Sequence, residues 1–138
     1  YTGSARTTVT GNSGFNIITG GDGNDLIRGG VGADDLYGKG GADTLHGEDD
    51  GDFIKGEEGD DKLYGGGAND QLLGGGGNDL LAGGEGYDTA DYSQADHALD
   101  IDMDRADEVL LANGDIDQLK SIELVVGTAF DDVFRASD

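Results

Sequence analysis

Aspartate recurs at every ninth position over much of the chain, a spacing that composition bias alone explains poorly. The eight residues are Asp25, Asp34, Asp43, Asp52, Asp61, Asp70, Asp79 and Asp88. Glycines precede each of them, and a glycine-rich turn exposes backbone carbonyl oxygens near the carboxylate. Oxygen ligands of both kinds suit Ca²⁺, which takes six to eight of them in flexible geometry. The alternative is that these aspartates only make hydrogen bonds within turns.

Other cations fit these residues less well. Mg²⁺ demands tighter octahedral geometry and retains water. Zn²⁺ prefers histidine and cysteine, whereas the chain has no cysteine and only His46 and His97. Asn16 takes the place of aspartate one period before Asp25, so a site that used it would be weaker or empty. The pattern therefore favours calcium, with the aspartates as its ligands.

The aspartates occupy the sixth position of nine consecutive nonapeptides that span residues 11–91. The first position is always glycine: Gly11, Gly20, Gly29, Gly38, Gly47, Gly56, Gly65, Gly74 and Gly83. The eighth position is always apolar: Ile18, Ile27, Leu36, Leu45, Ile54, Leu63, Leu72, Leu81 and Ala90. Glycines at positions one, two and four allow turns that a side chain would forbid. A short strand over positions seven to nine would direct position eight inward.

Residues 20–28, GGDGNDLIR, have the form G-G-x-G-x-D-x-U-x, in which U is a large aliphatic residue. Through this repeat, most of the chain resembles the repeat-in-toxin (RTX), or hemolysin-type, family of secreted bacterial modules. The resemblance implies an all-β fold, a right-handed parallel β-roll (a β-helix solenoid) with a C-terminal β cap. Two nonapeptides would make one coil, and successive coils would stack at roughly 4.8 Å.

The resemblance also implies where the ions lie. Each Ca²⁺ would sit between turns one coil apart, and both turns would supply a carboxylate and backbone carbonyls. The aspartates then form two columns, one that starts at Asp25 and one that starts at Asp34. The expected carbonyls are those of Gly21, Gly23, Gly30, Gly32, Gly41, Gly59, Gly66, Gly75 and Gly77. We expect about six to eight ions, counting weak sites at the ends.

Both ends of the repeat depart from its pattern. Residues 1–10 place Val9 at an eighth position without a metal-binding turn, which predicts an N-terminal capping rung before the roll of residues 11–91. Residues 92–138 would form the C-terminal cap. Within it, the alternation of Leu99, Ile101 and Met103 with acidic residues predicts a strand. We expect residues 92–126 to be an insertion folded over the end of the roll. Residues 127–135 would be a degenerate rung with Asp132 at position six and Phe134 at position eight.

The chain carries 30 acidic against 8 basic residues, a net charge of −22. Such a polyanion would repel nucleic acid and anionic membranes, so we expect neither nucleic-acid binding nor membrane insertion. A weakly hydrophobic and strongly charged chain stays disordered unless something neutralises it, which predicts folding on calcium binding. The resemblance implies type I secretion, to the medium or the bacterial cell surface. The module would be cut from a larger protein and would support an attached effector domain.

No residue constellation in the sequence predicts catalysis, because the repeat already accounts for the many carboxylates. The outward strand faces allow a different function. Arg28, His46, Lys62 and Tyr64 lie on successive coils of one predicted sheet, where basic and aromatic side chains in register could bind an acidic polysaccharide. The R-modules of alginate epimerases resemble this use. The alternative is a solvated sheet face, since isolated surface aromatics need no explanation. A polysaccharide-binding or adhesin module on a calcium scaffold is thus the second functional hypothesis.

Overall fold

The computed structural model describes residues 5–102 and 108–135, and in this part of the chain all regular structure is β-strand. Accordingly, no helix of the described residues could cross a membrane. The strands are β1 (Thr8–Thr10), β2 (Ile17–Thr19), β3 (Leu26–Val31), β4 (Asp35–Gly40), β5 (Thr44–Asp49), β6 (Phe53–Glu58), β7 (Lys62–Gly67), β8 (Gln71–Gly76), β9 (Leu80–Glu85), β10 (Thr89–Asp91), β11 (Leu99–Asp102), β12 (Glu108–Leu111), β13 (Ile116–Lys120), β14 (Leu124–Val126) and β15 (Val133–Arg135).

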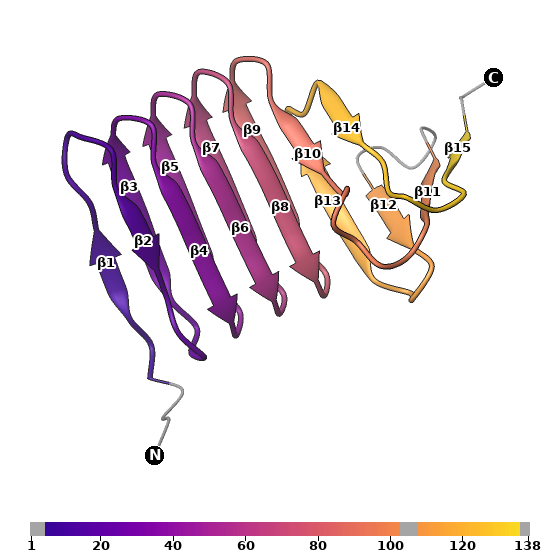
Figure 1. Cartoon of the computed structure of the whole chain (residues 1–138), viewed down its shortest axis with the longest axis horizontal. Coiled ribbons are helices and arrows are strands. Elements are labelled where there is room, and N and C mark those ends of the chain that lie inside the picture. Colours follow the sequence, from indigo (N-terminus) through magenta and orange to yellow (C-terminus); the bar gives the residue numbers. More distant parts are fainter. Residues whose placement is uncertain (1–4, 103–107, 136–138) are drawn as a thin grey trace.

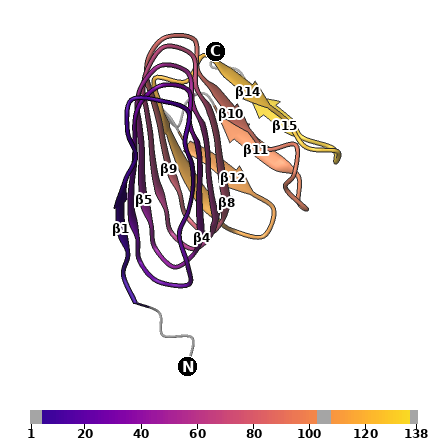
Figure 2. The same cartoon turned by 60° about the vertical axis from the view of Figure 1, so that its left-hand side comes forward.

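The repeats form a parallel β-roll of two facing sheets (Figures 1 and 2). Strands β1, β3, β5, β7 and β9 follow one another in one sheet, and β2, β4, β6, β8 and β10 in the other. Every neighbouring pair is parallel and shifted by one coil, so that Ile27 lies beside Leu45 and Leu36 beside Ile54. The chain therefore alternates between the sheets with each nonapeptide, as the repeat predicts.

The core is a thin apolar layer between the two sheets. Residues at position eight from Ile27 to Ala90 are fully buried. Because successive side chains in a strand point to opposite faces, the same pattern leaves positions seven and nine of most repeats on the outer faces. The strands run longer than the expected three residues: β3 to β9 each have six, because positions one to three of the following repeat also pair with their neighbours.

The repeat resumes after an interruption, in a rung that sequence reasoning placed elsewhere. Strand β13 pairs in parallel with β9, with Leu119 beside Leu81, and β14 pairs in parallel with β10, with Val125 beside Ala90. Residues 116–126, here called the return rung, therefore continue both sheets of the roll. The expectation that all of residues 92–126 fold over the end as an insertion is wrong for this part. Leu119 and Val125 continue the apolar columns of the core. Their distance in sequence from Leu81 and Ala90 does not fit the nine-residue period, so the period did not predict this position.

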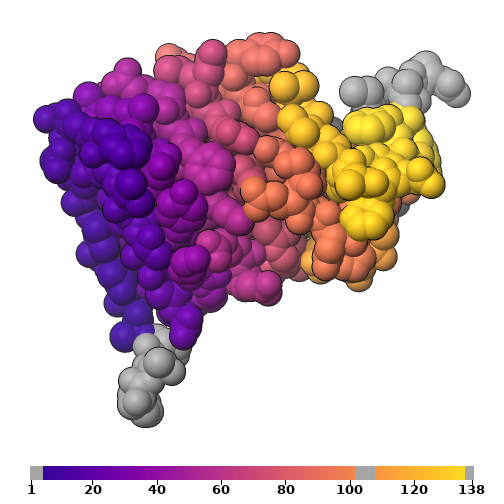
Figure 3. Space-filling view, in the orientation of Figure 1, coloured from indigo at the N-terminus to yellow at the C-terminus, as the bar shows by residue number. Residues whose placement is uncertain are grey.

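The remaining C-terminal strands extend the nine-stranded sheet and lie at one end of the roll (Figure 3). Strand β12 pairs antiparallel with β13 and with β11, and β15 pairs in parallel with β11. Residues 127–135 thus add to β11 and do not stack on the repeats. Phe134, expected to point inward, is 60% exposed, because no second sheet among residues 5–102 and 108–135 covers β15. Met103, expected in a strand with Leu99 and Ile101, lies outside the described residues.

Candidate metal sites in the turns

All eight aspartates of the repeat lie at the bends where a turn enters a strand, and all are buried. Their exposed fractions are 3% or less. They also lie in two columns along the roll, because residues one coil apart are neighbours in each sheet. Burial of a carboxylate is costly unless it is hydrogen-bonded and its charge is compensated. The contacts of the two oxygens of each carboxylate show how far the protein itself supplies these hydrogen bonds and compensating charges.

One oxygen of each carboxylate is satisfied by the neighbouring coil. The backbone N–H of Asp25 donates to Oδ1 of Asp43 at 2.7 Å, that of Asp43 to Asp61 at 2.8 Å, and that of Asp61 to Asp79 at 2.9 Å. The other column repeats the contact from Asp34 through Asp52 and Asp70 to Asp88, at 2.7 to 2.8 Å. The alternative reading, in which the aspartates make turn hydrogen bonds, therefore accounts for one oxygen of two.

The second oxygen has no partner in most of the turns. Buried Oδ2 atoms without a hydrogen bond belong to Asp34, Asp43, Asp52, Asp61, Asp70, Asp79 and Asp88. Asp25 differs, because its Oδ2 accepts the N–H of Gly21 at 2.7 Å. A buried polar atom without a partner costs on the order of 1–3 kcal/mol, and more when it is charged. Seven such atoms in one regular series indicate that a positively charged group belongs beside them.

Six of the seven orphaned oxygens pack against a first-position glycine together with a carbonyl oxygen of the next coil, whereas at Gly74, beside Asp79, the nearest atoms all belong to Asp79 itself. A Cβ added to Gly29 would lie closer than 3.0 Å to both Oδ2 of Asp34 and the carbonyl oxygen of Gly47. The same holds at Gly56, with Oδ2 of Asp61 and the carbonyl oxygen of Gly74. At these glycines a carboxylate oxygen of one coil and a carbonyl oxygen of the next thus approach the same Cα atom. Both are ligands that Ca²⁺ accepts.

The carbonyls that approach these Cα atoms belong to first-position glycines, whereas the sequence pointed to positions two and four. The nine glycines named there do lie in the same turns. Seven of them have φ between 110° and 129°: Gly30, Gly32, Gly41, Gly59, Gly66, Gly75 and Gly77. The carbonyl of Gly21 accepts the N–H of Gly40 at 3.0 Å, while that of Gly41 lies against Gly59 of the next coil. Both sets of carbonyls therefore line the stacked turns.

Side chains alone do not complete a metal site in the described residues, where no three His, Cys, Asp or Glu side chains converge. Two carboxylates and the turn carbonyls are what each site offers. This donor set fits Ca²⁺, which accepts carbonyl oxygens readily, better than Zn²⁺. Asn16 lies in the first turn, and its Nδ2 donates to Oδ1 of Asp34 at 2.9 Å, so an amide replaces a carboxylate there.

The electrostatics of the columns favour a bound cation or a proton. Burial raises the pKa of Asp61 to about 6 and that of Asp70 to about 7. The carboxylates of Asp52 and Asp88 raise the pKa of Asp70 further, while the N–H of Asp52 lowers it. Burial raises the pKa of Asp79 to about 8, and Asp117 adds to this effect. Like charges in a column of low polarity hold protons unless a cation replaces them.

Two acidic residues that sequence reasoning missed extend the columns. The N–H of Asp79 donates to Oδ1 of Asp117 at 2.9 Å, and the N–H of Asp88 donates to Oε2 of Glu123 at 2.8 Å. Both acceptors lie in or beside the strands of the return rung. A signal was present, since Asp117 precedes Leu119 by two residues, as the sixth position precedes the eighth in every repeat. However, no glycine-rich turn precedes Asp117 in the register of the repeat, so the nine-residue period did not identify Asp117 as a sixth-position residue.

The predicted sugar-binding residues are only partly aligned. Arg28, His46 and Tyr64 are neighbours in register on adjacent strands, and the rings of His46 and Tyr64 stack with centroids 4.7 Å apart. Lys62 lies in a different row, between Thr44 and Leu80. Arg28 pairs with Glu48 at 3.0 Å. A basic and aromatic row therefore exists, with one of its charges already matched.

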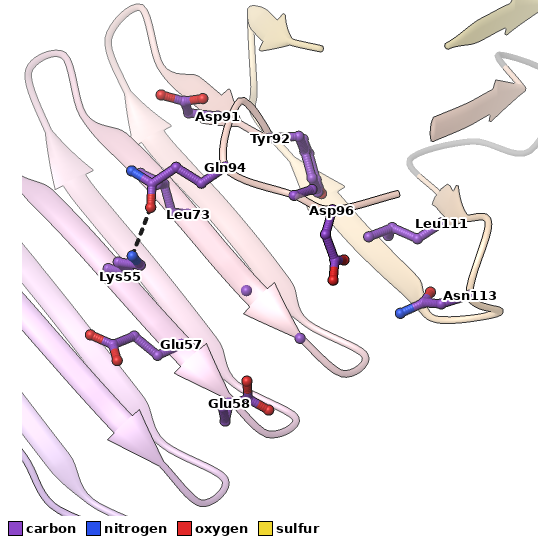
Figure 4. Close-up of a pocket in the computed structure, with 13 residues that line it drawn as sticks. Lys55, Glu57, Glu58, Leu73, Asp91, Tyr92, Gln94, Asp96, Leu111 and Asn113 are labelled. Carbon is purple, nitrogen blue, oxygen red and sulfur yellow. Dashed lines mark hydrogen bonds between the residues drawn. The ribbon is translucent and has the colours of Figure 1, made fainter. Parts of the chain in front are cut away.

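A hollow of about 360 Å³ lies on the other sheet, under the segment that follows β10 (Figure 4). Lys55, Glu57, Tyr92 and Leu111 are among its lining residues. Within it, Nζ of Lys55 donates to Oε1 of Gln94 at 2.8 Å (Figure 4). Its lining mixes acidic, basic, amide and apolar side chains, so it contrasts with the repeated geometry of the turns.

A comparison of the sequence with protein-family models finds a match over the repeats described above. A family model described as the RTX calcium-binding nonapeptide repeat, which covers four copies of the repeat, matches residues 1–36, 10–45, 37–72, 46–81 and 56–90. These matches together span more than half of the chain and include all eight aspartates. No curated protein matches the chain.

Proposed function

The chain belongs to the family of RTX calcium-binding nonapeptide repeats, and from this premise we propose that it is a module whose folding depends on calcium. The repeats of this family bind Ca²⁺, so the chain is a calcium-binding module of the RTX type. The observation that carries the finer proposal is the series of seven buried Oδ2 atoms without a partner. Each lies between coils, where one ion can neutralise two aspartates and hold two turns together.

Calcium binding and folding are coupled because the unliganded roll is electrostatically unfavourable. The net charge is −22, and the eight buried aspartates concentrate part of it in two narrow columns. Two unit charges about 4 Å apart repel by roughly 1 kcal/mol in water and by more near a protein surface. The apolar core that opposes this repulsion is a single layer of aliphatic residues. The free energy of ion binding is then also free energy of folding.

Members of this family are generally secreted bacterial proteins. Extracellular calcium modules work at millimolar concentrations, far above the calcium level of a bacterial cytosol. A chain that folds only at such concentrations stays unfolded during export by a type I system and folds outside. The role of the folded roll is then structural: it stabilises and helps to fold an attached effector domain, and it performs no catalysis itself.

Far-UV circular dichroism of the isolated chain during a calcium titration tests the proposal. Starting from chelator, we expect a cooperative change from coil to β-structure at calcium concentrations between micromolar and millimolar. Magnesium at the same concentrations should not produce it, because the flexible site suits the larger ion. A chain that is already β-rich in chelator would contradict calcium-dependent folding.

The row of Arg28, His46 and Tyr64 favours a second candidate function, binding of an acidic polysaccharide on the outer face of the nine-stranded sheet. The stacked rings of His46 and Tyr64 provide a flat surface of the kind on which a sugar ring packs. The double variant Lys62→Ala/Tyr64→Ala should weaken binding to alginate at saturating calcium. Absence of alginate binding by the unmodified chain would remove this candidate and leave the calcium module intact.

A further inference from the structure

The return rung reproduces the contacts of a repeat, although residues 92–115 separate it from the last nonapeptide. Strands β13 and β14 lie beside β9 and β10 (Figure 1). The N–H groups of Asp79 and Asp88 donate to Asp117 and Glu123 at 2.9 and 2.8 Å, the same lengths as between repeats. Asp117 and Glu123 therefore take the place of sixth-position aspartates for the last coil.

The last two aspartates of the repeats keep their orphaned oxygens against this rung. Asp79 and Asp88 are 2% and 0% exposed, and the Oδ2 atom of each is buried without a hydrogen-bond partner. If Asp79 and Asp88 only ended the hydrogen-bonded columns, the Oδ2 atom of each would be expected to contact solvent or a hydrogen-bond donor. Neither oxygen has one, so both sites have the same electrostatic demand as the sites inside the repeats.

The carbonyl beside Asp88 and Gly83 comes from a residue that is not glycine. A Cβ added to Gly83 would lie closer than 3.0 Å to both Oδ2 of Asp88 and the carbonyl oxygen of Ser121. One coil earlier, the corresponding space at Gly65 is bordered by Oδ2 of Asp70 and the carbonyl oxygen of Gly83. Lys120 lies beside Ala82, so Ser121 is in register with the first-position Gly83, although its φ of 49° differs from that of the first-position glycines. Its carbonyl thus replaces a first-position glycine carbonyl.

We propose that the return rung completes two further calcium sites, one between Asp79 and Asp117 and one between Asp88, Glu123 and the carbonyl of Ser121. The inference rests on the proposed calcium function and extends it beyond the nonapeptides. An ion at either site joins chain segments 35 or more residues apart, so it fastens residues 116–126 to the repeats. One column ends at Asp117, whose Oδ2 accepts the hydroxyl of Tyr92 at 2.8 Å and is therefore already satisfied.

Isosteric variants separate ion binding from the hydrogen bonds. Glu123→Gln and Asp117→Asn keep a carbonyl oxygen that can accept the N–H of Asp88 or Asp79, while each removes a negative charge. The matched control is Glu85→Gln, which makes the same change of charge at the exposed end of β9, outside the columns. Bound calcium is counted by equilibrium dialysis with calcium alone as the ligand. Amide hydrogen exchange reports separately on residues 116–126 and on residues 26–67.

The unmodified chain and the control should bind eight ions, six between the repeats and two at the return rung. Each single variant should lose one ion and the double variant two. Hydrogen-exchange protection should fall in residues 116–126 and persist in residues 26–67.

A double variant that binds as many ions as the unmodified chain overturns the inference. So does a count between one and six for the unmodified chain, which needs no variant to fold. An unmodified chain that binds no calcium overturns the proposed function itself, a result that differs from both of these.

Discussion

Glycine at position one of each repeat is required for a reason different from that at positions two and four. At positions two and four, φ is positive in most repeats, and Lys39, Asp50 and Ala68 keep this conformation although they have side chains. At position one, φ lies outside the positive range, but a Cβ would collide with the aspartate. The first-position glycine thus lets the aspartate oxygen pack directly against the backbone, and the others permit the turn.

This distinction predicts opposite results for two alanine substitutions. Gly56→Ala places a methyl group closer than 3.0 Å to both Asp61 and the carbonyl of Gly74. It should remove one bound calcium and destabilise the roll by about 1–3 kcal/mol through overpacking. Gly67→Ala is the control, since its Cβ would have its nearest neighbour at 3.9 Å and its φ is not positive. The control should keep every ion and have an unchanged or slightly higher stability in urea at saturating calcium. Equal effects of the two substitutions would contradict the role given to position one.

At the scale of strands, the nonapeptide period predicted the two sheets, the inward row and the two columns of aspartates, but not that these aspartates are buried. It could do so because each coil repeats the same demands on residues such as Asp61 and Leu63. The return rung was not predicted, because Leu119 follows its neighbour Leu81 by 38 residues, whereas neighbouring residues inside the repeats are 18 residues apart. Pairing between strands ignores this difference in chain length, while a search by period depends on it. The prediction that Phe134 points inward was wrong for the opposite reason. Its spacing fits the repeat, but in the described part of the chain no sheet faces its strand.

The contact between Tyr92 and Asp117 joins the segment after β10 to the return rung. Both side chains are nearly or fully buried, and the Tyr92 hydroxyl is the donor to Oδ2 of Asp117. Tyr92→Phe should destabilise the calcium-bound protein by roughly 1–3 kcal/mol, because it leaves a buried carboxylate oxygen unpaired.

Urea unfolding at saturating calcium measures this loss, and hydrogen exchange should locate it in residues 116–126. Tyr87→Phe is the control, because Tyr87 is exposed. If Tyr92→Phe is as stable as the control, the Tyr92 hydroxyl does not stabilise the buried carboxylate of Asp117.

At the scale of the whole molecule, acidic groups decide how the roll responds to pH. Burial raises the pKa of Asp52, Asp61 and Asp117 to about 6 from an ordinary value of 3.8. Burial raises the pKa of Asp70 to about 7 and that of Asp79 to about 8. The metal-free folded chain therefore binds protons more tightly than the unfolded chain does. These groups contribute stability that is fully present below pH 3.8 and is lost as the pH rises through about 6 to 8.

The calcium-free chain should accordingly gain β-structure when the pH falls from 8 to 5, a direction opposite to that of proteins stabilised by ionised carboxylates. Calcium competes with these protons for the same oxygens, so the calcium concentration at the folding midpoint should rise as the pH falls. Circular dichroism of metal-stripped protein at pH 5 and pH 8, followed by calcium titration at each, measures both effects. Dilute samples are needed because the sequence pI is about 4.1 and repulsion between chains weakens near it. A midpoint independent of pH would mean that the ions do not displace protons from the buried columns, and would point to ligation by carbonyl oxygens alone.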